Sequence, residues 1–433
     1  MEKSINEKLF DYIEKSPTAY HAADNTASLL RGAGYTELFE GGEWKLCGGK
    51  GYFVRRGGSS LIAFRIPDDG AVPSFMISAS HSDSPAFKIK ENAEQKAAGD
   101  AVRLSVEKYG GMLSQTWFDR PLSAAGRVAV RTENGMSVRL ADLEGMQAII
   151  PSLAIHLNRD SGNGAKLNPA VDMLPLYRCD GRGEEFSKLA ASAVGADADD
   201  VLSCDMFLYV PERGHSWNGY ISAPRLDDLQ CAFATLEAFM TADGGASCPV
   251  YCLFDNEEVG SATKQGAAST FLYDTLTRIC RERECGDLQR LISQSFMVSC
   301  DNAHAVHPNH PELCDPNHQV KMNGGIVIKY NANQHYTTDA VSAGIFRLVC
   351  EKAGVPCQMY ANRADMPGGA TLGSIANTKV SVNTVDIGLA QLAMHSAFET
   401  AGDCDTEYMV KALKKFFSAR IKCEGGEYEV SFG

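Results

Sequence analysis

Long apolar runs are missing from this sequence of 433 residues. Nowhere do about 18 apolar residues follow one another, as a membrane-spanning helix requires. The first 15 residues, MEKSINEKLFDYIEK, carry too many charges for the apolar part of a secretory signal peptide. We therefore expect a cytoplasmic protein that has no membrane as a partner.

A concentration of basic residues is missing as well. The 41 Lys and Arg residues are outnumbered by 54 Asp and Glu residues, which gives a net charge of −13. Proteins that bind nucleic acid use basic surfaces to neutralise phosphates, so this balance argues against nucleic acid as a partner.

The cysteine pattern of a disulfide-bonded protein is missing too. The fourteen cysteines include several in apolar contexts such as VYCLF and MVSC, which is typical of reduced, buried thiols. Cys248 and Cys252 are close in sequence, but the residues between them, Pro-Val-Tyr, are typical of a strand. We therefore expect no zinc finger at this place.

The apolar pattern alternates between helical and strand-like segments. Helical spacing occurs near the N-terminus (5–13 and 22–30) and again over 226–239 and 341–352. Between these segments lie six short β-rich runs: SLIAFRI, SFMISAS, PVYCLF, SFMVSC, GGIVIKY and KVSVNTVDIG. Such alternation predicts an α/β fold with a mainly parallel sheet flanked by helices.

A second pattern interrupts the first. Between about residues 91 and 219 the runs RLSVEKYGG, RVAVRTENGMSVRL and FLYVPERG alternate like antiparallel strands, with a turn signal at Asn134-Gly135. A chain of this length exceeds one typical core. We expect a discontinuous catalytic domain, residues 1–91 and 219–433, and an inserted β-rich domain over 92–218.

Candidate metal ligands follow four of the predicted strands. Strand ends of α/β sheets commonly carry the functional site, and imidazole and carboxylate groups suit zinc. The candidates are His81 and Asp83 after SFMISAS, Glu257 and Glu258 after PVYCLF, Asp301 after SFMVSC, His395 after the last run, and Asp227 at a helix start.

Each candidate also has an ordinary structural interpretation. Asp227 suits a helix N-cap, Asp301 suits a turn, and the adjacent glutamates could be a solvated pair. The recurrence at four strand ends favours a hydrolytic metal site. There, one glutamate binds a cation while the other accepts a proton from the attacking water. Asp83 suits a bond to the second ring nitrogen of His81.

Seven motifs resemble the aspartyl aminopeptidase family of di-zinc metallopeptidases, which includes vacuolar aminopeptidase I. They occur in the family's order and span the chain from the first strand end nearly to the C-terminus. They are HSDSPAFKIK (81–90), EKYGGMLSQTWFDRPLSAAGRV (107–128), LAIHLNR (153–159), PRLDDL (224–229), FDNEEVGS (254–261), DNAHAVHPNH (301–310) and DIGLAQLAMHSAFE (386–399).

The resemblance implies two divalent cations per chain, zinc first, with cobalt or manganese as ions that the same ligand types accept. His81 and Asp301 would hold one, Glu258 and His395 the other, and Asp227 would bridge both. Glu257 would be the general base. Asp83 would be the partner of His81.

The resemblance also implies how substrates are recognised. Lys329 would favour peptides that begin with Asp or Glu, with Tyr336 and His304 near the bound peptide. His156 would reach the active site of a neighbouring subunit. Two segments depart from the family pattern and concern the substrate pocket: Gly325-Ile326-Val327 replaces a Gly-Pro-Val run, and RADMPGGAT (363–371) replaces RNDSPCGST.

The expected function is therefore the removal of N-terminal Asp or Glu from short or unfolded peptides by a homododecamer. A broad or neutral-residue aminopeptidase of the same family, and a related di-metal carboxypeptidase or deacylase, are the alternatives within enzymology. A non-catalytic assembly or binding module is the alternative outside it, and the complete set of ligands plus base argues against that.

Overall fold

The computed structural model describes residues 3–159, 164 and 166–432. Its centre is a nine-stranded sheet in the order β1-β2-β3-β13-β4-β14-β18-β16-β17. Five of the eight neighbouring pairs are parallel, which confirms the predicted α/β class. The strands are β1 (Thr36–Leu38), β2 (Gly51–Arg56), β3 (Ser60–Arg65), β13 (Cys248–Phe254), β4 (Phe75–His81), β14 (Phe296–Cys300), β18 (Asn383–Gly388), β16 (Ile326–Tyr330) and β17 (Cys357–Ala361).

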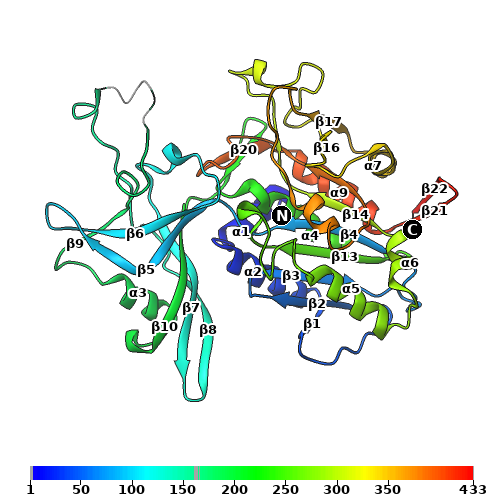
Figure 1. Ribbon diagram of the computed structural model, residues 1–433, viewed down its shortest axis with the longest axis horizontal. Helices are drawn as coiled ribbons and strands as arrows, with labels where there is room; N and C mark the ends of the chain where they lie inside the picture. The colour runs from blue at the N-terminus through cyan, green and yellow to red at the C-terminus, as the bar shows by residue number, and fades with distance from the viewer. Residues whose placement is uncertain (1–2, 160–163, 165, 433) are drawn as a thin grey trace.

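Helices cover both faces of this sheet (Figure 1). Successive strand residues point to opposite faces, so Met76 and Ile77 of β4 belong to two separate buried clusters. The Met76 face packs against α1 (Ile5–Glu14), α2 (Ala19–Gly32), α4 (Leu226–Thr241), α7 (Ala340–Ala353) and α9 (Asp405–Phe417). The Ile77 face packs against α5 (Phe271–Glu282), α6 (Leu288–Ser293) and α8 (Leu372–Asn377).

A six-stranded antiparallel sheet, order β8-β7-β10-β5-β6-β9, lies beside this body, on the left of Figure 1. Its core is a third buried cluster that includes Phe87, Trp117 and Phe186. Its strands run from residue 86 to residue 209, and the division into two domains stays a prediction. The elements are β5 (Ala86–Lys96), β6 (Ala101–Tyr109), β7 (Ser123–Thr132), β8 (Gly135–Asp142), β9 (Leu176–Cys179), α3 (Phe186–Ala193) and β10 (Val201–Tyr209).

Two smaller sheets were not predicted, because their strands are short or lie near the chain end. One is five-stranded, order β11-β12-β20-β19-β15, and the other is the terminal hairpin β21-β22. Their strands are β11 (His215–Trp217), β12 (Tyr220–Ala223), β20 (Glu399–Gly402), β19 (Ala390–Leu392), β15 (Ala303–His304), β21 (Ala419–Glu424) and β22 (Glu427–Phe432).

All fourteen cysteines are free thiols, and Cys248 and Cys252 are buried within β13. None of the helices in the described ranges is long and apolar enough to cross a membrane.

Candidate active site

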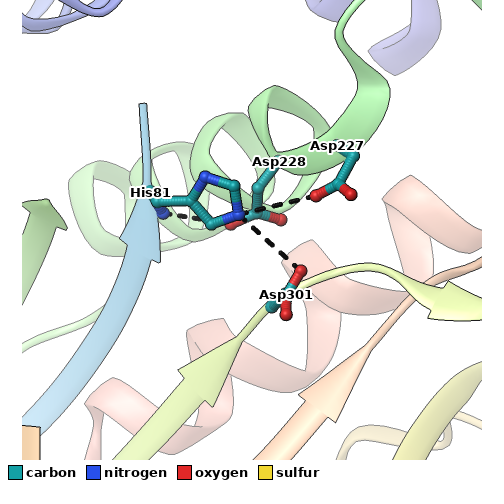
Figure 2. Close-up of side chains that lie close together, drawn as sticks. All are labelled: His81, Asp227, Asp228 and Asp301. Carbon is teal, nitrogen blue, oxygen red and sulfur yellow. Dashed lines mark hydrogen bonds and ion pairs between the residues drawn. The ribbon is translucent and has the colours of Figure 1, made fainter. Parts of the chain in front are cut away.

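The predicted metal ligands converge at the carboxyl ends of adjacent strands. Figure 2 shows His81 at the end of β4, Asp301 directly after β14, and Asp227 in the first turn of α4. His81 Nε2 lies 3.5 Å from Asp227 Oδ1 and 3.8 Å from Asp301 Oδ1. These side chains come from distant parts of the sequence and form one buried group.

A second group shares Asp227 with the first. Its other oxygen, Oδ2, lies 3.4 Å from His395 Nε2, which in turn lies 3.4 Å from Glu258 Oε2. Asp227 therefore presents one oxygen to each group. This is the arrangement that a residue bridging two cations requires, although its role stays a prediction.

The donor atoms fit a cation. Asp227 Oδ1 and Glu258 Oε1 are buried, and neither accepts a hydrogen bond from a described residue. A buried carboxylate oxygen without a partner is costly, and a metal ion would satisfy it. Ligand atoms in each group lie within 4.8 Å of one another, and His81, Glu257 and Glu258 form a third such group.

The electrostatics also favour positive charge at this place. Burial opposes ionisation, yet the rings of His395 and His81, 3.4 and 3.5 Å from its oxygens, hold the pKa of Asp227 well below its usual range. Burial likewise favours a neutral imidazole, but Asp227 raises the pKa of His395 to about 9. The carboxylates therefore attract positive charge strongly, as a site for divalent cations needs.

Glu257 lies in a short 3₁₀ turn, Glu257–Val259, that follows β13. Burial raises the pKa of its carboxyl to about 7, with His81 opposing the shift and Asp301 adding to it. A carboxyl group with a pKa near neutrality can both accept and return a proton, as a general base and acid must.

Asp83 holds this turn in place. Its Oδ1 accepts a hydrogen bond from the Glu257 backbone N–H and its Oδ2 one from the Glu258 N–H, each at 3.1 Å. The oxygen closest to His81 Nδ1 is the Asp83 carbonyl, at 3.0 Å, and Oδ1 lies 3.4 Å away. The main chain of Asp83, more than its carboxylate, therefore orients the His81 ring.

Two acidic residues at the site were missed from the sequence. Asp228 is fully buried, and its Oδ2 accepts a bond of 3.1 Å from the His81 backbone N–H. Glu399 accepts bonds from the backbone N–H groups of Asp227 (3.0 Å) and His395 (2.7 Å). The second Asp of PRLDDL and the Glu after HSAF were the available signals.

The predicted substrate residues are placed differently from one another. Lys329 is 2% exposed, and its Nζ lies 3.3 Å from Asp301 Oδ2 and 5.2 Å from the Tyr336 ring centre. His304 is exposed beside the Tyr360 ring. His156 is exposed in a turn, and this single chain does not bring it to the metal-ligand groups.

Known proteins resemble this chain over nearly its whole length. The family model described as aminopeptidase I zinc metalloprotease (M18) matches residues 12–417. Proteins named probable M18 family aminopeptidase 2 from Clostridium acetobutylicum and Pseudomonas aeruginosa PAO1 are 41% and 39% identical. These alignments cover 96% and 97% of this chain and 99% of each relative.

Solved structures share the fold. Ape4, from a cryo-EM structure of its complex with Nbr1, superposes with a TM-score of 0.91 at 33% identity, covering 95% of this chain and 85% of the other. The mApe1 dodecamer of S. cerevisiae superposes with a TM-score of 0.84 at 25% identity, covering 96% of both chains.

Proposed function

The chain belongs to the M18 family of aminopeptidase I zinc metalloproteases, and we propose that it removes N-terminal Asp or Glu residues from peptides. The observation that supports hydrolysis is the convergence of the five predicted ligands and Glu257 in overlapping groups, in each of which the ligand atoms lie within 4.8 Å of one another. In this proposal His81 and Asp301 hold one ion, Glu258 and His395 hold the second, and Asp227 contacts both.

Two bound zinc ions, or cobalt or manganese in their place, would supply an activated water and stabilise negative charge on the scissile carbonyl oxygen. Glu257 accepts a proton from the attacking water and returns it to the departing amine. Its raised pKa, about 7, suits both transfers. Asp83 keeps the Glu257 backbone fixed while the side chain exchanges its proton.

The acidic preference is assigned to Lys329. Its ammonium group has three N–H donors, of which Asp301 Oδ2 and the Asn302 carbonyl accept two. The remaining donor can bind the side-chain carboxylate of a substrate. Burial opposes the charge of Lys329, but Asp301 raises its pKa, so the side chain stays cationic.

Replacing Lys329 with Met should lower kcat/KM for Asp- and Glu-initiated peptides about 10- to 100-fold more than for Leu-initiated peptides. Loss of the bond to Asp301 acts on kcat/KM for both kinds of peptide. The ratio of the two kcat/KM values cancels this common effect. Equal losses on acidic and neutral substrates would contradict the assignment and favour the broad aminopeptidase alternative.

A peptide with an acetylated N-terminus separates aminopeptidase action from the carboxypeptidase and deacylase alternatives. We expect product analysis to find this peptide intact, while the free peptide loses residues singly from its N-terminus. Release of C-terminal residues or of acetate would favour the alternatives.

We further propose a dodecamer in which the catalytic domain (1–91 and 219–433) is assembled through the inserted domain (92–218). The dodecameric mApe1 relative supports this proposal. In such an assembly His156 would enter a neighbouring active site, and only short or unfolded peptides would reach the interior. The cytoplasmic location also stays a prediction, which cell fractionation tests.

Light scattering checks the assembly directly. Twelve chains of 46.8 kDa each give about 560 kDa. A fully active particle of one chain would overturn both the dodecamer and the role of His156, and a fully active particle of two chains would overturn the dodecamer alone.

A further inference from the structure

The segment Tyr109–Thr116, which begins at the last residue of strand β6 of the six-stranded sheet, lies against two loops of the metal-ligand groups. It belongs to the motif EKYGGMLSQTW, and none of the roles above uses it. The Leu113 N–H donates to the His395 carbonyl (3.0 Å), and the Ala397 N–H donates to Thr116 Oγ1 (2.9 Å). The segment is therefore attached to the chain around His395.

Tyr109 connects the same segment to the loop that carries Glu257. Its hydroxyl donates to Asp83 Oδ2 at 2.7 Å and accepts a bond of 2.9 Å from Asn256 Nδ2. The ring is held on the other side by an edge-on contact with Phe207 of β10, 5.6 Å between ring centres. The hydroxyl position is thus set by the six-stranded sheet.

Asp83 connects the Tyr109 hydroxyl to the backbone of both glutamates. The oxygen that accepts the Tyr109 hydroxyl, Oδ2, also accepts the Glu258 backbone N–H, while Oδ1 accepts the Glu257 N–H. Asn256, the second partner of the hydroxyl, directly precedes Glu257. One hydroxyl therefore fixes both the start of the turn and the carboxylate that holds it.

The next residue leaves space for this contact. Gly110 has φ +71°, and a Cβ atom there would lie 3.1 Å from Glu258 Cβ. A larger residue would press on Glu258 and adopt a backbone conformation that favours glycine. The close approach indicates that the segment packs directly against the glutamate pair at Glu258.

We infer that Tyr109 is a positioning residue for the proposed hydrolytic site, acting through Asp83 on the backbone of Glu257 and Glu258. The six-stranded sheet then completes the active site of its own chain, in addition to any part in assembly. This inference rests on the proposed function, and zinc binding tests it separately from substrate choice.

The variant Tyr109→Phe removes the hydroxyl and keeps the ring on Phe207. We expect kcat to fall about 10- to 100-fold with KM within about twofold, and the zinc dissociation constant of the metal-free protein to rise about tenfold. The matched control is Tyr177→Phe on β9 of the same sheet. Its ring makes an edge-on contact with Phe186, 5.9 Å between ring centres, and its hydroxyl donates to the Glu184 carbonyl, so all three values should stay within about twofold of the wild type.

A double-mutant cycle in zinc affinity decides whether Tyr109 acts through Asp83. The zinc dissociation constant should be the same in Asp83→Ala and in the double variant Asp83→Ala/Tyr109→Phe, because alanine offers no side-chain acceptor to the Tyr109 hydroxyl. Wild-type kcat and zinc affinity in Tyr109→Phe would overturn the inference. A zinc affinity of the double variant that fell by the product of the two single losses would also overturn it. This result does not depend on which peptides the enzyme cleaves.

Discussion

Replacing Glu257 with Gln is expected to lower kcat by about 10²- to 10⁴-fold, the contribution of a well-placed general acid–base group. The amide has nearly the same shape as the carboxylate but cannot accept the proton of the attacking water. The backbone N–H of residue 257 still donates to Asp83, so the turn and the predicted ligand Glu258 should keep their positions. Substrate KM and zinc content should therefore stay close to the wild-type values.

The matched control is Glu407→Gln, a surface glutamate on α9 that pairs with Lys411. Its kcat should equal that of the wild type, since exposed ion pairs contribute little. Steady-state kinetics and zinc analysis of both variants check the prediction. A Glu257→Gln enzyme with more than about a tenth of wild-type kcat would assign proton transfer to another group.

Replacing Asp227 with Ala should abolish the binding of both ions, and activity with it. Each of its oxygens faces one histidine, Oδ1 towards His81 and Oδ2 towards His395. Its loss removes a ligand from both groups at once. We expect elemental analysis to find almost no zinc, about 0.1 per chain or less, and kcat/KM to fall more than about 10³-fold.

His395→Ala is the informative comparison for Asp227. It removes a ligand from the second group alone, so one zinc per chain should remain. If Asp227→Ala and His395→Ala each lost a single ion, Asp227 would serve one metal, and the bridging role would be wrong.

The fold and the closeness of the predicted ligands could be predicted from the sequence for one physical reason. In a mainly parallel sheet, strand ends meet at one edge, so ligands that follow apolar strands gather there. The ends of β4, β13 and β14 are neighbours in the sheet. The closeness of His81, Glu258 and Asp301 could therefore be predicted without knowing how distant parts of the chain pack.

The supporting residues were not accessible in the same way. Glu399 and Asp228 matter because they bind backbone N–H groups of His395, Asp227 and His81, and such bonds leave no spacing pattern. The pairing of Lys329 with Asp301 depends on β16 lying next to β18 in the sheet. The five-stranded sheet has strands of two to four residues, too short for a periodic signal.

Anomalous X-ray diffraction from crystals of the zinc-loaded protein tests the central claim most directly. The account predicts two zinc peaks about 3.5–4 Å apart. One should contact His81 and Asp301, the other Glu258 and His395, and Asp227 should contact both. A single zinc, or zinc ions bound away from these five side chains, would contradict it.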